Sequence, residues 1–568
     1  MRYMPKAIIG KNPAAGAHGG GVRGDQVNRG SRIFEGRFGR MFRSLPAAEF
    51  DDKLLEALAE KMSSKPERNP PNTGKPSAAK ETETTIQDGE ENTGIPAGYT
   101  YLGQFIDHDI TFDPASSLQK RNDPDGLIDF RTPALDLDSL YGRGPDDQPY
   151  MYDATGRKFI LGEDLTEEIG GERKTFDLPR LGERKRAVIG DKRNDENVII
   201  SQLHSVFLQF HNRFADDPKF KGFSFAEIQR LVRWHYQYVV LHDFLPKIVG
   251  EETMQKIWPD RKDIYCCGKE PHLCFYHFHD DAYMPIEFAA AAYRFGHSMV
   301  RPIYRLNTKH IQLQSGDDPN IAGRFFIFAG VQERGLNGFG AFPRHWAIDW
   351  SLFFDINGSG KGIGKKRAQP AYKIDTSIVN PLAFLPEFSA PPLPKDTALT
   401  IESLQSTEIS HKSPNNLAIR NLWRGNSMGL PSGQDVARAM GETPLNDNEL
   451  FIGKAQMKDD GLTMDAISID SFEGGYFKNK SPLWFYILAE SNAQWFKNAN
   501  GKSKDDADHV PVTMGPVGGR IVAETLIGLI LADSHSFINQ DPKWKPMIPI
   551  ANPNTFTMGD LVKYALDI

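Results

Sequence analysis

The chain has 568 residues, a net charge of -7 and the composition of an ordinary globular protein, with 39% hydrophobic and 25% charged residues. This acidic balance argues against a nucleic-acid-binding protein, because no strong basic field is present to attract phosphates. No apolar stretch approaches the roughly 20 residues of a membrane-spanning helix, and the N-terminus lacks the apolar run of about 7–15 residues that a secretory leader needs. We therefore expect a cytoplasmic protein without a membrane span.

The first 93 residues differ in composition from the rest of the chain. They hold a glycine cluster at 19–21, an amphipathic pattern at 47–62 and a polar, proline-rich run at 63–92. Such a run is short of aromatic residues and is typical of a linker or of an arm that lies on a surface. We therefore predict an N-terminal extension over residues 1–93, partly flexible, followed by one large domain over residues 94–568.

Helical patterns dominate the large domain. Apolar residues recur at helical spacing over 199–214 and 225–249, the alanine-rich segment 288–299 favours a helix, and 521–531 is almost wholly apolar. Strand-like alternation is sparse. A segment rich in Gly, Pro and Lys at 355–400 is typical of a long surface loop. The sequence thus predicts a mainly α protein with little β structure.

Three cysteines lie close together, at Cys266, Cys267 and Cys274, and two histidines follow, His277 and His279. An odd and small number of cysteines does not make a disulfide framework. Their spacing fits no common zinc module. We therefore interpret this segment as an ordinary loop in preference to a metal site.

The segment 103–114 carries the densest group of chemically active side chains. Gln104 and His108 are four residues apart, so on a helix they share one face. Asp107 lies close to that face, whereas Asp109 points elsewhere. The apolar neighbours predict a largely buried helix, in which ionisable groups need partners. A polar helix end capped by acids explains the same spacing equally well.

Three further clusters contain candidate functional residues. Arg193 and Glu196 are three apart and can share a helix face, although a surface salt bridge is the usual role of such a pair. His297 ends the sequence Tyr-Arg-Phe-Gly-His, and a lone histidine on an apolar helix is more often a core residue than a ligand. Asn421 lies within a third cluster, at 418–425.

A loop at 132–142 presents oxygen atoms at alternate positions. Thr132 supplies a hydroxyl, Ala134 a carbonyl, and Asp136 and Asp138 supply carboxylates. Calcium takes six to eight oxygen ligands of this kind. A strand end that bears aspartates is the alternative interpretation.

In this order along the chain, the clusters resemble the motifs of the animal-type haem peroxidases, the peroxidase–cyclooxygenase superfamily, and in particular of its bacterial members. The resemblance runs from about residue 95 to the C-terminus, with marks at 103–109, 135–142, 190–197, 210–213, 293–297, and Asn421 with 429–431. It implies a mainly α, animal haem peroxidase-like fold with little β structure. The haem would be buried in a helical core, between the 103–109 and 288–299 helices.

The resemblance implies an enzyme that reduces hydrogen peroxide via Compound I and oxidises phenolic or aromatic donors or small anions such as bromide, iodide and thiocyanate. His108 is then the distal histidine, which takes a proton from peroxide and delivers it to the departing oxygen. Arg193 stabilises the negative charge that develops as the O–O bond breaks. Gln104 holds water, peroxide or a halide by its amide.

The resemblance also assigns the residues that bind haem b. His297 is the proximal ligand of the haem iron, and Asn421 accepts the hydrogen of its Nδ1, which leaves Nε2 for the iron. The resemblance also places Arg294 among the residues that bind the haem. Asp107 and Glu196 match two carboxylates that form esters with haem methyl groups in the mammalian members, so we expect covalent haem.

Asn197 stands where some members carry a methionine that forms a third link to the haem. That link cannot form here, and we therefore do not expect chloride oxidation at neutral pH.

The resemblance implies a calcium site as well. The calcium loop of the family matches Asp109, Thr132, the carbonyl of Ala134, Asp136 and Asp138. A serine often stands at the last of these positions, and a carboxylate is an equally good hard ligand. Because the first of them adjoins the distal histidine, calcium would fix the distal helix in place.

Two rival functions stay open. The first is a fatty-acid dioxygenase of the same superfamily, but the radical-forming tyrosine of cyclooxygenases stands three residues before the proximal histidine, where this chain has Arg294. Tyr293 is adjacent and would face about 100° away on a helix. The second is a haem-binding protein without turnover, which is disfavoured because every catalytic position is present.

Hydrogen peroxide and small-molecule electron donors are the partners that the resemblance implies, with no nucleic acid. The oligomeric state and the physiological donor stay open. Bacterial members make secretion by a non-classical route an alternative to the cytoplasm.

Overall fold

The computed structural model of the chain describes residues 36–65, 89–112, 128–171, 174–259, 261, 270–278, 281–309, 324–328, 335–356, 367–383, 385, 415–457, 464–503, 506–507, 509–549 and 555–568. Helices form 46% and strands 11% of the structure, which confirms the mainly α prediction. None of the described helices is long and apolar enough to cross a membrane.

The α-helices of the described ranges are α1 (Asp52–Met62), α2 (Gly98–Ile110), α3 (Asp138–Tyr141), α4 (Val198–Asp216), α5 (Phe225–Val239), α6 (Leu245–Val249), α7 (Glu251–Ile257), α8 (Ile286–Ala289), α10 (Leu417–Ser427), α11 (Gly433–Ala439), α12 (Leu483–Ala499), α14 (Pro516–Ala532), α15 (Phe537–Gln540) and α16 (Met558–Ala565). The strands pair into small sheets. In one sheet β1 (Gly36–Gly39) lies between β3 (Ile128–Asp129) and β6 (Met284–Pro285). The others are the pairs β2 (Glu91–Pro96) with β9 (Pro370–Tyr372), β4 (Arg180–Leu181) with β5 (Arg186–Ala187), β7 (Ile303–Arg305) with β8 (Arg324–Phe326), and β10 (Phe451–Met457) with β11 (Met464–Ser468).

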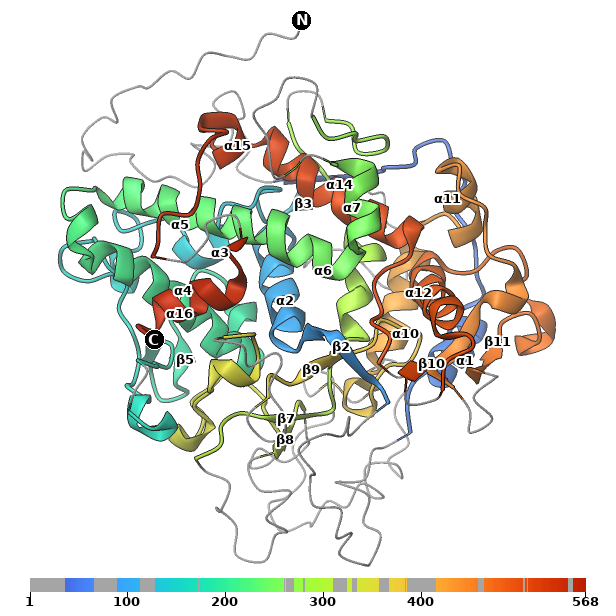
Figure 1. Ribbon diagram of the computed structural model, residues 1–568, viewed down its shortest axis with the longest axis horizontal. Helices are drawn as coiled ribbons and strands as arrows, with labels where there is room; N and C mark the ends of the chain where they lie inside the picture. Colours follow the sequence, from blue (N-terminus) through green and yellow to red (C-terminus); the bar gives the residue numbers. More distant parts are fainter. Residues whose placement is uncertain are drawn as a thin grey trace, which may run out of the picture.

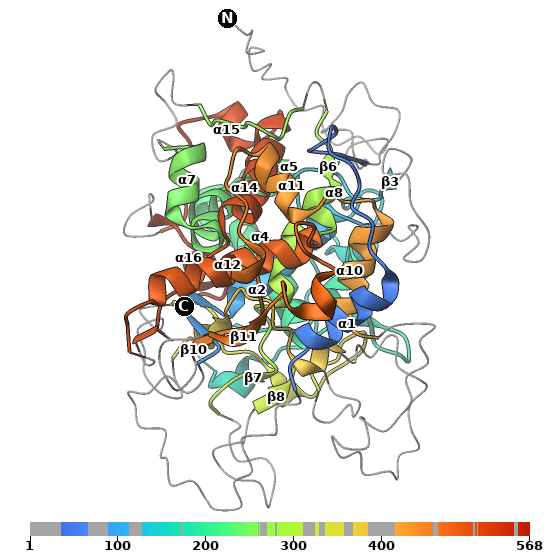
Figure 2. The same cartoon turned by 90° about the vertical axis from the view of Figure 1, so that its right-hand side faces the viewer.

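Helix α2 lies near the centre of the molecule in both views (Figure 1 and Figure 2). It packs against α4, where the rings of Phe105 and Phe207 stack with centroids 4.4 Å apart. The helices predicted at 103–109, 199–214 and 521–531 are confirmed as α2, α4 and α14. Each of these segments is strongly apolar and is buried along most of its length, so pattern and packing agree.

The helical run predicted at 225–249 is present but is not uniform. A capping box begins α5, in which Ser224 and Glu227 satisfy each other's backbone N–H groups. Residues Val240–Phe244 then form a π-helical turn before α6. Pro246 lies in the first turn of α6 and has no N–H to donate to the preceding turn, so the backbone widens there.

The continuous helix predicted at 288–299 is wrong. Helix α8 ends at Ala289, Ala291 leaves the helical region with φ -138° and ψ -72°, and a 3-10 helix follows at Ala292–His297. The break allows the ring of Tyr293 to stack on that of Phe288, with centroids 4.5 Å apart. Residues five apart on one α-helix point to different faces and could not stack in this way. Tertiary packing here overrides the helix propensity of alanine.

The described part of the N-terminal 93 residues packs on the rest of the chain. Glu287 is fully buried and accepts hydrogen bonds from the backbone N–H groups of Met41 and Phe42, at 3.0 and 3.1 Å. Helix α1 begins only at residue 52, because the side chain of Asp51 caps it. Strand β2 crosses the predicted boundary between residues 93 and 94 and pairs with β9.

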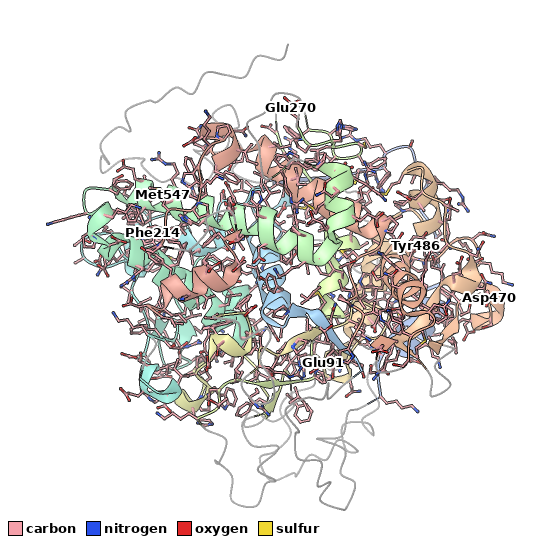
Figure 3. All side chains as sticks on the ribbon, in the orientation of Figure 1. Glu91, Phe214, Glu270, Asp470, Tyr486 and Met547 are labelled. Atoms are coloured by element: carbon pink, nitrogen blue, oxygen red, sulfur yellow. The ribbon has the colours of Figure 1, made fainter. Side chains whose placement is uncertain are left out.

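The surface loop predicted at 355–400 is wrong over residues 367–383. Strand β9 lies in this segment, and Ala371 and Ile374 are fully buried. Glu91 of β2, labelled in Figure 3, is 1% exposed and accepts a hydrogen bond from Arg367 at 2.8 Å. A periodicity argument misses such a strand because only three residues pair.

Several predictions fall outside the described residues. They concern the glycine cluster at 19–21, residues 66–88 of the polar run, Cys266, Cys267 and His279, and most of 357–400 outside 367–383.

Candidate active site

A cavity of about 650 Å³ lies beside α2 and is enclosed by segments that are far apart in the sequence. Its volume is within the usual range for ligand and cofactor sites. The predicted site residues that line it are Gln104, Asp107, His108, Arg193, Glu196, Arg294 and His297. The fold therefore brings these side chains to one place, although α2 and His297 are separated by almost two hundred residues.

His108 is buried on α2, and its Nδ1 lies 2.7 Å from Oδ1 of Asn194. Burial, with a contribution from the Arg193 guanidinium, lowers the pKa of His108 to about 3. The imidazole is therefore neutral at neutral pH. With Nδ1 in this hydrogen bond, Nε2 is the ring nitrogen left for a ligand in the cavity.

Arg193 is held in place by several contacts. Its guanidinium donates to Asp191 at 2.8 Å and to the backbone carbonyl of His108 at 2.9 Å, and it lies 4.5 Å from the ring centroid of Phe112. Burial opposes the ionisation of Asp191, but the guanidiniums of Arg193 and Arg131 outweigh it and hold the pKa of this carboxyl below its usual range. The pair therefore stays charged, and Arg193 presents a fixed positive group at the cavity.

The amide of Gln104 is held between two side chains of one segment. Its Nε2 donates to the carboxylate of Glu196, and its Oε1 accepts from Nδ2 of Asn197 at 3.4 Å. Asn197 also caps α4 with its Oδ1, which accepts two backbone N–H groups at 3.1 and 2.9 Å. The start of α4 therefore fixes both the carboxylate and the amide at the cavity wall.

Asp107 lies one turn along α2 from Gln104, at the same cavity. Its carboxylate accepts a hydrogen bond from Thr111 at 3.0 Å. Burial raises the pKa of Asp107, and the positive charges of Arg193 and Arg294 oppose the rise.

His297 ends the 3-10 helix Ala292–His297, and its Nδ1 lies 2.7 Å from Nδ2 of Asn421. Arg294 donates to Oδ1 of the same amide at 2.6 Å. A guanidinium can only donate, so it takes the carbonyl end of the amide and turns the amide nitrogen toward the imidazole. This direction differs from our prediction, in which Asn421 accepts a hydrogen from His297. Burial, followed by the charge of Arg294, lowers the pKa of His297 to about 3, so the ring is neutral.

These residues fit a haem. Nδ1 of His297 accepts from Asn421, so the hydrogen of the neutral ring is on Nε2, and this nitrogen can bind iron only by releasing that hydrogen. Gly296 and His297 both line the cavity, and a Cβ added at Gly296 would meet no atom within 4 Å beyond its chain neighbours, so the cavity is open at this glycine. The same cavity holds a second neutral histidine and a fixed arginine, which is the donor set that a peroxide-reducing haem site needs.

The carboxylates of Asp109, Asp136 and Asp138 lie close together, on the side of α2 opposite to the cavity. We call these three residues, with the loop that carries the last two, the acid loop. One oxygen from each lies within 4.8 Å of the others, and all three are buried. Burial and the charges of the other two raise the pKa of Asp109 well above its usual value, and burial with the charge of Asp138 raises the pKa of Asp136 to about 7. A bound cation would relieve this repulsion.

The other residues predicted for calcium lie in the same loop. The hydroxyl of Thr132 is buried and has no hydrogen-bond partner among the described residues. Ala134 is 2% exposed, and its N–H donates to the carbonyl of Thr132 at 2.8 Å. Leu137 has a left-handed backbone, with φ 59°, which turns its N–H toward Asp109 at 3.1 Å. The donor set consists of oxygen atoms and suits a hard divalent cation such as calcium.

Arg131 connects the acid loop to the cavity. Its Nη1 lies 3.2 Å from Asp138, and its Nε lies 2.9 Å from Asp191, which also binds Arg193. Negative and positive groups therefore alternate from the acid loop to the cavity wall. This contact could not be predicted from the sequence, because Arg131 and Asp191 are sixty residues apart in the chain.

The cysteine-bearing segment shows no metal cluster in its described part. Cys274 is an exposed free cysteine. Its sulfur accepts a hydrogen bond from Arg520 at 3.1 Å. Among the described residues, neither Cys274 nor His277 belongs to a group that could hold a metal.

The fold and the cavity define a mainly helical protein whose central pocket presents two neutral histidines and an arginine. The sequence model of the animal haem peroxidase family matches residues 117–329 of this chain. The matched range contains Arg193, Glu196 and His297, whereas α2 and Asn421 lie outside it.

Among curated relatives, the chain is similar to the peroxidasin homolog of Mus musculus, at 24% identity over 230 residues. That alignment covers 38% of this chain and 15% of the relative, so the chain spans only a small part of it.

Two solved structures have the same fold. Peroxidase A from Dictyostelium discoideum superposes with a TM-score of 0.51 at 15% identity, over 93% of both chains. A fatty acid alpha-dioxygenase from Arabidopsis thaliana gives a TM-score of 0.52 at 13% identity, over 91% of this chain and 76% of that one. The chain therefore shares the fold of these two structures.

We expect Asp191→Asn to destabilise the protein by about 3–5 kcal/mol, because it leaves two buried guanidiniums without their shared carboxylate. Urea unfolding followed by circular dichroism measures this change. Asp147→Asn is the matched control, since Asp147 pairs with Arg143 at 3.4 Å with both side chains more than half exposed, and an exposed pair contributes about 0–1 kcal/mol. If Asp191→Asn and Asp147→Asn had the same free energy of unfolding, the prediction that the Asp191 carboxylate stabilises the two guanidiniums would be wrong.

Proposed function

We propose that this protein is a haem peroxidase, which reduces hydrogen peroxide and oxidises phenolic or aromatic donors or small anions such as bromide, iodide and thiocyanate. The observation that carries the proposal is the convergence of His108, Arg193 and His297 on one cavity. The family match and the fold agree with it.

His297 would hold the haem through Nε2, which would release its hydrogen when the iron binds. When bound, the haem supplies the redox-active iron and the coordination position for peroxide. His108, being neutral, accepts a proton from hydrogen peroxide at Nε2 and returns it to the departing oxygen, so that water leaves. Arg193 stabilises the negative charge on that oxygen, and because Asp191 and the His108 carbonyl already orient it, no rearrangement is needed as the charge develops.

Two carboxylates of the cavity, Asp107 and Glu196, support a proposal of covalent haem attachment. Both carboxylates line the cavity, and they come from different segments of the chain. We propose that they form the two ester links. Asn197 follows Glu196 and has no sulfur, so a third link of the methionine type cannot form, and chloride is not among the proposed donors.

The acid loop is proposed to bind calcium. Three buried carboxylates, a buried hydroxyl that lacks a partner among the described residues, and the carbonyl of Ala134 would supply oxygen ligands. Asp109 is the residue next to His108 on α2, so a cation there would fix the helix that positions the base.

A fatty-acid dioxygenase is the second candidate function. Tyr293 lines the cavity, and its buried hydroxyl has no hydrogen-bond partner among the described residues. One structural neighbour is named as such an enzyme. The residue three before His297 is nevertheless Arg294, which binds Asn421. Oxygen uptake with linoleate or arachidonate in the absence of peroxide would favour this function over the peroxidase.

Two histidine variants test the peroxidase proposal. We expect His297→Ala to lose the haem, and His108→Leu to keep it while the rate of peroxide reduction falls by about 10²–10⁴-fold. Absorption spectra before and after peroxide, followed by a panel of donors, measure both effects. His277→Gln is the control, because His277 is exposed and lies outside the cavity lining. Failure of the wild-type chain to bind haem, or a His108→Leu variant as fast as the wild type, would contradict the proposal.

Extraction with acid acetone tests the ester links. We expect haem to stay with the protein after turnover with peroxide, to extract partly from Asp107→Asn or Glu196→Gln, and to extract fully from the double variant. Each link needs its own carboxylate oxygen, which an amide does not provide. Complete extraction from the wild-type protein after turnover would exclude the links.

Removal of calcium tests the acid loop. We expect EGTA to lower the thermal unfolding midpoint of the wild-type chain, because a ligand at 100 times its dissociation constant stabilises a protein by about 2.7 kcal/mol. Asp136→Asn is the matched variant and should show little response to either calcium or EGTA. The same unfolding midpoint for the wild type with calcium and with EGTA would refute the site.

A further inference from the structure

Asn194 bridges two buried histidines next to the cavity. Its Oδ1 lies 2.7 Å from Nδ1 of His108, and its Nδ2 lies 3.0 Å from Nδ1 of His204. The side chains come from three segments, α2, the 3-10 helix Lys192–Asp195 and α4. Asn194 and His204 are fully buried and His108 is 5% exposed, so water does not compete for these hydrogen bonds.

An amide has one accepting end and one donating end, and this asymmetry selects a tautomer on each neighbouring ring. With Oδ1 toward His108, the hydrogen of that ring must be on Nδ1, and Nε2 carries the lone pair. With the amide reversed, Nδ1 of His108 would have to accept, and the hydrogen would move to Nε2. A ring with its hydrogen on Nε2 cannot take a proton from a ligand at that atom.

The orientation of the Asn194 amide in the structure allows its hydrogen bond to His108 in both protonation states of that histidine. While His108 is neutral, Oδ1 of Asn194 accepts the hydrogen of its Nδ1. After Nε2 has gained a proton, Nδ1 still carries its hydrogen and the same bond persists. The reversed amide would place two donors against each other as soon as His108 became charged.

The opposite end of the amide faces His204. In this orientation Nδ1 of His204 accepts from Asn194, so the ring is neutral with its hydrogen on Nε2, an atom that has no hydrogen-bond partner among the described residues. The ring is fully buried and packs against Phe105 of α2, with centroids 6.0 Å apart. Burial also disfavours a charged His204 and lowers its pKa to about 3, in agreement with a ring that accepts.

We propose that Asn194 is a positioning residue, which keeps the hydrogen of neutral His108 on Nδ1 and thereby keeps the lone pair of Nε2 available to the cavity. The proposal rests on the proposed function, in which His108 is the base of peroxide reduction. His204 acts one step further away, through the amide.

Ligand binding to the haem-loaded protein separates this role from a structural one. Binding of neutral hydrogen cyanide requires a base to take its proton, whereas binding of carbon monoxide to the reduced protein requires none. In Asn194→Leu we expect cyanide association and peroxide reduction to slow by about 10- to 100-fold, as is typical when the partner that orients an imidazole is removed. Carbon monoxide association should stay within about twofold of the wild type, since no proton moves.

Asn194→Asp is the conservative variant, because a carboxylate can only accept and therefore also requires the hydrogen on Nδ1 of His108. We expect it to restore most of the cyanide rate. Asn307→Leu is the matched control, since Asn307 is also a buried asparagine, with hydrogen bonds of 2.9 and 2.8 Å to the backbone carbonyls of His345 and Ala347, outside the cavity lining. Should Asn194→Leu fold poorly, His204→Phe removes the acceptor at the far end of the amide and should slow cyanide association in the same direction.

A second measurement does not require haem. In the full-length chain labelled with ¹⁵N-histidine, the signal lost in His108→Gln identifies His108, and its ring nitrogen shifts report the tautomer. We expect hydrogen on Nδ1 in the wild type and in Asn194→Asp, and a shift toward Nε2 in Asn194→Leu.

An unchanged tautomer in Asn194→Leu, or a cyanide rate within about twofold of the wild type, would overturn the proposal. A parallel loss of carbon monoxide binding would also overturn it, since general damage to the cavity would then explain the slower rates. A wild-type chain that binds no haem would instead contradict the proposed function, and the nitrogen shifts would still decide whether Asn194 sets the tautomer.

Discussion

The shared carboxylate of Asp191 is the interaction on which the arrangement of the site depends. It is 2% exposed and contacts the guanidiniums of both Arg131 and Arg193. Arg131 also pairs with Asp138 of the acid loop, and Arg193 binds the backbone of α2. Each of these charges is at least half-buried, so removal of one leaves another in a low dielectric without compensation. The network therefore fixes the acid loop, the 3-10 helix Lys192–Asp195 and α2 relative to one another.

Two asparagines orient the two histidines of the cavity, and they do so in opposite senses. Asn194 presents its oxygen to His108 and its nitrogen to His204. Asn421 presents a nitrogen to His297, because its oxygen is taken by Arg294. At Asn421 the guanidinium of Arg294, which can only donate, decides which end of the amide the imidazole meets. Burial keeps both rings neutral. Nε2 of His108 then carries a lone pair, whereas Nε2 of His297 carries a hydrogen that it must release in order to bind a metal.

The break between α8 and the following 3-10 helix shows why the local sequence did not predict the backbone that carries His297. Alanine-rich sequence favours a continuous helix, yet the chain leaves the helical region at Ala291. Stacking of Tyr293 on Phe288 and the hydrogen bond from Arg294 to the carbonyl of Ala289, at 3.0 Å, are available only after the break. These tertiary contacts outweigh a propensity that amounts to less than about 1 kcal/mol per residue.

The sequence by itself determined the long buried helices, because α2, α4 and α14 carry an apolar pattern that only a helix can bury. It also indicated which residues belong to the cavity, since ordered motifs fix residue types and their spacing. Only the tertiary structure decided the partners of those residues. Arg131 meets Asp191 and Asn194 meets His204 because separate segments pack together, and an amide acquires its direction only when both of its neighbours are in place. Spacing along a chain specifies which face of a helix a residue occupies, but contacts across the core depend on how those faces pack.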